Sequence, residues 1–208
     1  MLDNKGFDLW ADTYEKTVKS SDKEDVYPFA GYKTLMNKVY NIILSNNGNN
    51  ILDIGIGTGI LCEKLYREGF SITGIDFSDE MLKICRAKMP TAKIIQYDFT
   101  KGFPESIKND SFDHIICTYA IHHIEDDAKI RFIKELVKIL KSNGSLIIGD
   151  IGFTTKDELE ECKRLHEDEW DNDEHYFIYD EIKSKIPDEY KIMYEQISFC
   201  AGVMKIEK

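Results

Sequence analysis

The segment ILDIGIGTGI, residues 51–60, constrains the fold more than any other, because three glycines directly follow a short apolar run. Gly55, Gly57 and Gly59 recur at every second position. Glycines inside a buried strand weaken it and leave no side chain to pack, and a flexible linker would not begin with Ile-Leu-Asp-Ile. We therefore interpret this segment as a strand that ends in a turn whose backbone comes close to a ligand.

Strand and helix patterns alternate from this segment as far as Asp150. We expect strands at 50–55, 71–76, 92–98, 112–119 and 145–151, and helices at 58–68, 78–89 and 126–142. Ser78 is the expected N-cap of the second of these helices, and Asn143 and Gly144 are expected to end the third. This succession predicts a parallel sheet with helices on both faces, a doubly wound Rossmann-like α/β fold.

The two ends of the chain have other patterns. Apolar residues at helical spacing predict helices at 6–19 and 32–44. Residues 155–186 have a helical, acidic pattern. Two strands follow, and their short connection at 199–202 can only join antiparallel neighbours. We expect a seven-stranded sheet with five parallel strands plus this C-terminal antiparallel pair.

This organisation predicts a single domain over residues 1–208. Within it we distinguish N-terminal helices (1–46), a central core (47–152), and acidic cap helices with the C-terminal strand pair (153–208).

Composition and charge narrow the class of partner. The net charge is −11, and residues 156–189 hold 14 acidic and five basic side chains. A nucleic-acid surface needs the opposite sign, so no nucleic-acid partner is expected. The acidic segment is either a solvated helical face or a rim that attracts cationic substrates. No signal peptide or membrane-spanning run is recognised, and the five scattered cysteines suggest reduced thiols, so we expect a cytoplasmic protein without a membrane partner.

The glycine turn does not have the spacing typical of dinucleotide-binding proteins. The GxGxxG pattern would need glycine at position 60, where this chain has Ile60. Asp53 lies two residues before the first glycine, and its charge would oppose a pyrophosphate at this turn. A ligand that carries an ammonium group and a sulfonium would suit Asp53 better.

At this point the chain resembles the class I S-adenosylmethionine-dependent methyltransferases, especially their small bacterial members. ILDIGIGTG is similar to the first motif of that family, and ITGIDFSDEMLKICRAK to its second strand, acidic strand end and following helix. YDFT, FDHIICTYAIHHI and LKSNGSLIIGD match the next three strand regions, and FDLWADTYEKTV resembles the N-terminal lid helix. The resemblance covers nearly the whole chain, and it implies a methyltransferase with S-adenosyl-L-methionine as cofactor. It also implies that residues 1–46 are an N-terminal helical lid, which would close over the cofactor and exclude water from it, and that residues 47–152 are the cofactor-binding core.

The resemblance also implies which residues bind the cofactor. Asp76, with Phe77 beside it, would accept both ribose hydroxyls, and Asp98 the adenine amino group, with Phe99 beside the ring. Gly55 and Gly57 would approach the methionyl part, Asp53 would favour its ammonium group, and Tyr119 would lie near the transferable methyl. Two of these aspartates have a structural alternative: Asp76 as an acid at a helix N-terminus, and Asp98 as a strand-end turn residue.

His122 and His123 follow the fourth strand and suggest either a general base or a metal site. His123, with an ordinary pKa, would take a proton from the acceptor, and Tyr14 of the lid is its expected partner by analogy with phosphobase methyltransferases. The alternative is that the histidines only cap a helix or pack. We expect no metal site, because adjacent histidines on an extended segment point apart and no third ligand is evident. Since the sulfonium already activates the methyl, positioning alone can carry the reaction.

The acceptor depends on the parts of the chain that are least similar to the family. Those parts are rich in aromatic residues, which favours a small, partly apolar acceptor: Trp10, Tyr14, Phe29, Tyr32, Trp170, His175, Tyr176 and Phe177. The same aromatics can instead form the core of the cap. The expected function is therefore methyl transfer to a small molecule by a monomer or homodimer. A macromolecular acceptor and a non-catalytic cofactor-binding protein are the alternatives.

Overall fold

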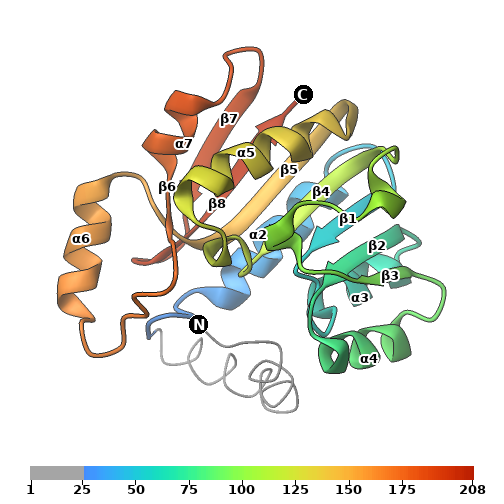
Figure 1. The fold of residues 1–208 in the computed structure, drawn as a ribbon, viewed down its shortest axis with the longest axis horizontal. Helices are drawn as coiled ribbons and strands as arrows, with labels where there is room; N and C mark the ends of the chain where they lie inside the picture. Colours follow the sequence, from blue (N-terminus) through green and yellow to red (C-terminus); the bar gives the residue numbers. More distant parts are fainter. Residues whose placement is uncertain (1–25) are drawn as a thin grey trace.

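A central sheet organises the computed structural model, which describes residues 26–208 (Figure 1). Its strand order is β3-β2-β1-β4-β5-β8-β7. The strands are β1 (Asn50–Ile54), β2 (Ser71–Asp76), β3 (Lys93–Gln96), β4 (Phe112–Thr118), β5 (Leu140–Phe153), β7 (Lys191–Gln196) and β8 (Ala201–Glu207). Strands β1 to β5 are parallel, β8 is antiparallel to β5, and β7 is antiparallel to β8. The predicted sheet is confirmed, and a two-residue strand, β6 (Phe177–Ile178), pairs with the end of β5 in addition.

Helices cover both faces of the sheet, as predicted. They are α2 (Tyr32–Leu44), α3 (Ile60–Arg67), α4 (Asp79–Lys88), α5 (Asp126–Lys138), α6 (Lys156–Leu165) and α7 (Tyr179–Lys185). The apolar faces of α2, α3 and α4 share one core cluster, and those of α5 and α7 share the other. Figure 1 shows α5 in front of the sheet and α2 behind it. Ser78 caps α4 as expected, since its hydroxyl accepts a hydrogen bond from the Met81 N–H at 3.2 Å.

The predicted helix over 126–142 is too long. Helix α5 ends at Lys138, and Leu140 begins β5, where it pairs with Phe112. Leu140 and Phe112 are both buried in the sheet. Burial in the sheet outweighs the helical pattern of this stretch, because tertiary packing routinely overrides local propensity.

The acidic segment, predicted to be helical over 155–186, is helical only in part. Helix α6 starts with a capping box formed by Thr155 and Glu158, and it ends at Leu165. The chain then follows an irregular path to β6 and α7. The His175 N–H donates to the His122 carbonyl at 2.8 Å, and Tyr176 is buried beside it. These contacts tie the segment to the end of the sheet, a position that a continuous helix would not reach.

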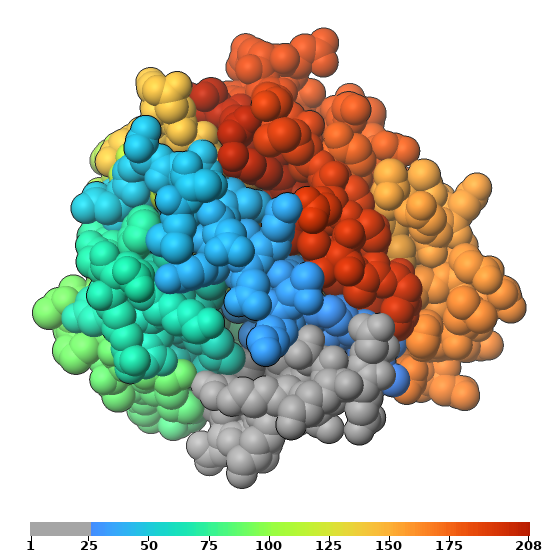
Figure 2. Space-filling model, turned by 180° about the vertical axis from the view of Figure 1, so that it is seen from behind, coloured from blue at the N-terminus to red at the C-terminus, as the bar shows by residue number. Residues whose placement is uncertain are grey.

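Helix α2 is a fixed part of the core. Leu35, Val39 and Ile43 are fully buried, and a Cβ at Gly149 of β5 would meet Leu35 at 2.6 Å. Figure 2 shows α2 in blue beside the red C-terminal strands, in agreement with its contacts to β8. This packing makes α2 part of the core, and the lid over residues 1–46 stays a prediction. The helix expected at 6–19 lies outside the described residues.

The loop between the last two strands is close to its predicted position. It spans residues 197–200, two positions earlier than expected. All five cysteines are buried and free. No helix within residues 26–208 is long and apolar enough to cross a bilayer.

Candidate functional site

A cavity of about 410 Å³ opens at the carboxyl ends of β1, β2 and β4, the edge where ligands bind in doubly wound sheets. One wall is formed by the glycine turn and the strand ends, with Asp53, Gly55, Gly57, Asp76, Phe77, Phe99 and Tyr119. A second part of the lining is formed by Tyr27, Phe29, Tyr32, His122, His123, Glu169, Asp171, Glu174 and Tyr176. We call the two parts the cofactor wall and the acceptor wall, after the groups that the sequence leads us to expect there.

The glycine turn comes close to another part of the protein at Gly55, and the predicted approach of this turn to a ligand stays a prediction. Gly55 has φ +72°, and a Cβ there would lie 2.4 Å from the Ala120 Cβ. Gly57 has φ +53°, but a Cβ there would meet no atom within 4 Å. Gly55 is therefore required by packing and conformation, whereas Gly57 keeps its stretch of the cavity open.

Asp53 is a buried carboxylate on the cofactor wall. Its Oδ2 accepts a hydrogen bond from the Cys62 thiol at 3.1 Å, and its Oδ1 has no hydrogen-bond partner among the described residues. Burial raises the pKa of Asp53 to about 7, and the nearby charge of Asp76 adds to the rise. A buried carboxylate oxygen without a partner fits the ammonium group of S-adenosylmethionine, which would supply both a hydrogen bond and a compensating charge.

Asp76 ends β2 and is also buried on the cofactor wall. Its Oδ2 accepts a hydrogen bond from the Gly57 N–H at 2.8 Å, and its Oδ1 accepts one from the Ser78 N–H at 2.9 Å. The carboxylate thus joins the glycine turn to the start of α4. Both readings of this residue are visible here, since Asp76 lines the cavity and also binds the amide groups beside a helix N-terminus.

Asp98 differs from the other predicted cofactor residues, because it is not among those that line the cavity. Its carboxylate accepts hydrogen bonds from the Thr100 N–H at 3.1 Å and the Thr100 hydroxyl at 2.6 Å, and forms an ion pair with Lys101 at 2.9 Å. Burial favours the neutral acid, but Thr100 and Lys101 outweigh it and lower the pKa of Asp98. Its neighbour Phe99 is buried and does line the cavity. A role of Asp98 toward adenine stays a prediction.

Tyr119 connects the two walls. It has φ +49°, a left-handed conformation that is uncommon for a residue other than glycine and is often found at functional sites. Its ring lies 5.5 Å from the ring of Phe29 and 5.1 Å from that of Tyr32, measured between centroids. The aromatic face expected beside the transferable methyl is therefore held by two further rings.

The two histidines do not point apart, as the sequence suggested. Residues Ile121–His123 form a 3₁₀ turn, η3, instead of an extended segment, and the two imidazole centroids lie 4.1 Å apart. A carboxylate that sequence reasoning missed lies beside them: Glu174 Oε1 is 3.6 Å from His122 Nε2. The turn brings the adjacent rings together, so the geometric argument against a shared ligand site is wrong.

The expected ordinary pKa of His123 is also wrong. Burial and the neighbouring His122 lower the pKa of His123 to about 3, which makes it a weak base. His122 differs, because its Nδ1 lies 2.7 Å from Asp150 Oδ1. Burial opposes the charged form of His122, but the Asp150 carboxylate outweighs it and raises the pKa of this histidine. Tyr14, the expected partner of His123, lies outside the described residues.

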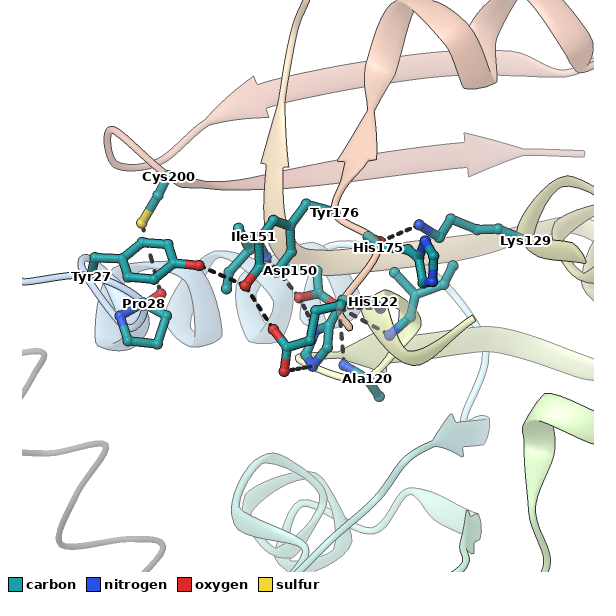
Figure 3. A network of polar contacts seen from close by, with 12 residues as sticks. Tyr27, Pro28, Ala120, His122, Lys129, Asp150, Ile151, His175, Tyr176 and Cys200 are labelled. Atoms are coloured by element: carbon teal, nitrogen blue, oxygen red, sulfur yellow. Dashed lines mark hydrogen bonds and ion pairs between the residues drawn. The ribbon is translucent and has the colours of Figure 1, made fainter. Parts of the chain in front are cut away.

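A chain of polar contacts holds the acceptor wall together (Figure 3). The Tyr176 hydroxyl donates to Glu174 Oε2 at 2.8 Å and lies 2.6 Å from the Tyr27 hydroxyl. Since the single proton of Tyr176 goes to Glu174, Tyr27 donates to Tyr176. Asp150, at the end of β5, accepts backbone hydrogen bonds from Ala120 and Ile121 as well as contacting His122.

Three members of this chain, Tyr27, Asp150 and Glu174, were not predicted from the sequence. Asp150 stands at the end of a predicted strand within LKSNGSLIIGD, so its position at the carboxyl edge was a usable signal. Glu174 gave no such signal, because it is one acid among the many of residues 156–189.

Comparisons with known proteins agree with this geometry. A family model described as a methyltransferase domain matches residues 51–144. A protein of Alkaliphilus oremlandii, described as an uncharacterized methyltransferase, is 32% identical over 88% of this chain and 81% of its own length.

Solved structures share the fold at low sequence identity. An S-adenosylmethionine-dependent methyltransferase from Clostridium acetobutylicum has a TM-score of 0.68 at 16% identity, covering 93% of this chain and 98% of that one. Magnesium protoporphyrin IX methyltransferase from Synechocystis, solved with bound S-adenosylhomocysteine, has a TM-score of 0.67 at 16% identity, covering 86% and 84% of the two chains.

Proposed function

Because the chain belongs to the class I S-adenosylmethionine-dependent methyltransferases, we propose that it transfers the methyl group of this cofactor to a small-molecule acceptor. The observation that carries the proposal is the two-walled cavity. Its volume of about 410 Å³ is in the range of small-molecule sites. The cofactor wall has the residue types that the cofactor needs, and the acceptor wall is rich in aromatic rings.

The acceptor wall supports an acceptor that is partly apolar. Tyr27, Phe29, Tyr32 and Tyr176 line it, and rings of this kind bind flat or apolar groups well. Among the described residues that line the cavity, none is a lysine or arginine, whereas three acids line the acceptor wall. The wall therefore attracts positive charge near the acceptor, and its acidity argues against nucleic acid as substrate.

The reaction is an in-line displacement. A lone pair of the acceptor attacks the methyl carbon, the carbon–sulfur bond breaks, and the sulfur keeps the electron pair as a neutral thioether. The protein supplies orientation, which can contribute roughly 7–11 kcal/mol, and a desolvated site. The face of Tyr119 toward the sulfonium would add about 0.5–2 kcal/mol.

The experiment is a methyl-transfer screen that reads the release of S-adenosylhomocysteine. Parallel incubations contain a metabolite pool, an undigested protein fraction or purified RNA, and each is repeated with Asp76→Ala as the control for specific turnover. We expect release with the metabolite pool alone. Release with protein or RNA instead would overturn the small-molecule acceptor.

Calorimetry with S-adenosylhomocysteine separates an enzyme from a non-catalytic binding protein. We expect both binding and turnover. Binding without turnover in any pool would support the non-catalytic alternative, and absence of binding would contradict the assignment of the cofactor wall.

A further inference from the structure

Three side chains of the acceptor wall converge on one point. His122, His123 and Glu174 each offer one ligand atom, and these atoms all lie within 4.8 Å of one another. His122 Nε2 and Glu174 Oε1 are 3.6 Å apart. A tetrahedral zinc ion with bonds of about 2.0–2.1 Å places its ligand atoms roughly 3.3 Å apart. The His122–Glu174 spacing is thus close to that of a zinc site, and side-chain rotation would have to bring the remaining ligand atom to the same spacing.

The orientation of His122 is that of a metal ligand with a supporting carboxylate. Asp150 is completely buried, and its Oδ1 lies 2.7 Å from His122 Nδ1. A hydrogen bond from Nδ1–H to Asp150 leaves the lone pair on Nε2, which faces Glu174. Metal-binding histidines almost always donate their second ring nitrogen in this way, because it fixes the tautomer and the ring orientation.

Glu174 is supported in the same manner. Tyr176 donates to its Oε2, so Oε1 is the oxygen that faces His122. The backbone of this segment is anchored to η3 by the bond from the His175 N–H to the His122 carbonyl, and Lys129 also donates to the His175 carbonyl. His122 and Glu174, which are 52 residues apart in the chain, are therefore each held in place by a further hydrogen bond.

We propose that His122, His123 and Glu174 bind one divalent zinc-class metal ion on the acceptor wall. Two imidazoles and one carboxylate form the ligand set of catalytic zinc sites that keep one coordination position open. No lysine or arginine is present among the described residues that line the cavity. The buried Lys129 acts electrostatically on His122, and its charge is offset by an ion pair with Asp126 at 3.2 Å. The metal also supplies the positive charge that the acids of this wall attract.

The role of the metal rests on the proposed function. The open position would take the hydroxyl or thiol of the acceptor and lower its pKa, as zinc does for bound water. The acceptor proton leaves to solvent, its oxygen or sulfur forms the bond to the methyl carbon, and the carbon–sulfur bond of the cofactor breaks with both electrons on sulfur. The acceptor class is therefore a hydroxyl- or thiol-bearing small molecule.

Metal binding is tested directly on the full chain after chelator treatment and dialysis. Zn²⁺ is titrated in competition with a chromophoric chelator, and Co²⁺ is used as a spectroscopic probe of four- or five-fold coordination. We expect one tight equivalent. His122→Gln, His123→Gln and Glu174→Gln should each weaken it by at least about 100-fold, and Tyr176→Phe, which removes a supporting contact, by about 10-fold.

Matched controls separate this site from adventitious binding. His175→Gln and Glu160→Gln change a histidine and a carboxylate that do not line the cavity, and both should bind Zn²⁺ like the unchanged chain. If the buried His122 variant does not fold, Glu174→Gln decides, because the Glu174 side chain is 20% exposed and tolerates the change.

Three outcomes would overturn the metal site. They are no saturable Zn²⁺ binding, equal binding by Glu174→Gln and the unchanged chain, and a loss of binding in the controls as large as in the ligand variants. If Zn²⁺ binds as expected but no acceptor pool releases S-adenosylhomocysteine, the metal site stands and the proposed function fails. If turnover is found with amine acceptors and is unaffected by chelator, the acids of this wall bind an ammonium group instead.

Discussion

The two walls of the cavity are built in opposite ways. Most of the cofactor wall comes from a short part of the chain, in which Asp53, Gly55, Gly57 and Asp76 lie on two adjacent strands and the turn between β1 and α3, and only Phe99 and Tyr119 come from later segments. The acceptor wall gathers Tyr27, His122, Glu174 and Tyr176 from segments far apart, and the Tyr27–Tyr176 contact spans 149 residues. One wall is local and can be recognised from spacing, whereas the other exists only once the sheet has formed.

The strongest test of the local wall is Gly55→Ala. The new Cβ would lie 2.4 Å from the Ala120 Cβ at a φ of +72°, so both overpacking and left-handed strain apply. We expect a loss of about 2–4 kcal/mol in the free energy of unfolding, measured by chemical denaturation.

Gly57→Ala is the matched control for this clash. Its φ is +53°, but no atom lies within 4 Å of the new Cβ, so only the strain of about 1–2 kcal/mol remains. It should keep the fold and lose cofactor affinity, because the methyl group enters the cavity. Equal stability of the two variants would contradict the packing role of Gly55.

The next largest effect is expected for Asp76→Ala. Loss of hydrogen bonds to a charged acceptor should weaken S-adenosylhomocysteine binding by about 1.5–3 kcal/mol in calorimetry. The same carboxylate accepts hydrogen bonds from the amides of Gly57 and Ser78, so the variant should also have a lower free energy of unfolding than the unchanged chain. Asp79→Ala, on the exposed first turn of α4, is the control. Unchanged affinity in a folded Asp76 variant would remove this residue from the site.

The sequence predicted the fold wherever the pattern was local. Helix α2 and strand β2 have the predicted bounds, and the Ser78 cap was recognisable from its position before an apolar stripe. The predictions failed where distant residues decide the local structure. Leu140 joins β5 because it pairs with Phe112 of β4. Residues 166–176 are not helical, because His175 forms hydrogen bonds with His122 and Lys129.

The site follows the same division. The placement of Asp53, Asp76, Gly55 and Gly57 at the cavity was predictable because it follows from spacing along the chain, and their roles toward the cofactor stay predictions. The position of Glu174 beside His122 was not predictable, since Glu174 is one of many acids in its segment. Only its contact with Tyr176 in the folded chain distinguishes it. The orientation of adjacent histidines was predicted wrongly because it depends on whether they lie on a strand or on a 3₁₀ turn.

Asp53 predicts a pH dependence confined to the cofactor wall. Its pKa is raised to about 7 by burial, and the cofactor's ammonium group favours the charged carboxylate. Below pH 7, binding must therefore release a proton, and affinity for S-adenosylhomocysteine should rise about tenfold per pH unit from pH 5 to pH 7. Calorimetry at pH 6 in buffers of different ionisation enthalpy measures that proton. Asp53→Asn should release no proton on binding. Proton release by this variant equal to that of the unchanged chain would contradict the contact between Asp53 and the ammonium group.

The same shift has a consequence for stability without ligand. Because the folded carboxyl keeps its proton to about pH 7, whereas the unfolded one loses it near the ordinary value of 3.8, the folded state binds more protons between these limits. The contribution of Asp53 to the free energy of unfolding should therefore fall as pH rises from about 4 to about 7. Denaturation curves of Asp53→Asn should lack this decline, and a decline that persists in the variant would assign it to other groups.

The smallest effect is expected on the acceptor wall. Tyr27→Phe removes one buried hydrogen bond, that of the Tyr27 hydroxyl to Tyr176, while leaving the Tyr176–Glu174 contact in place. The free energy of unfolding should fall by about 0.5–1.5 kcal/mol. Affinity for S-adenosylhomocysteine should stay unchanged, because no cofactor-wall residue contacts this bond. A double-mutant cycle with Tyr176→Phe should give a coupling of similar size, since each single variant breaks the same bond. A loss of cofactor affinity in Tyr27→Phe would mean that the two walls are energetically coupled. The walls would then differ in the chain segments that form them but not act independently in binding.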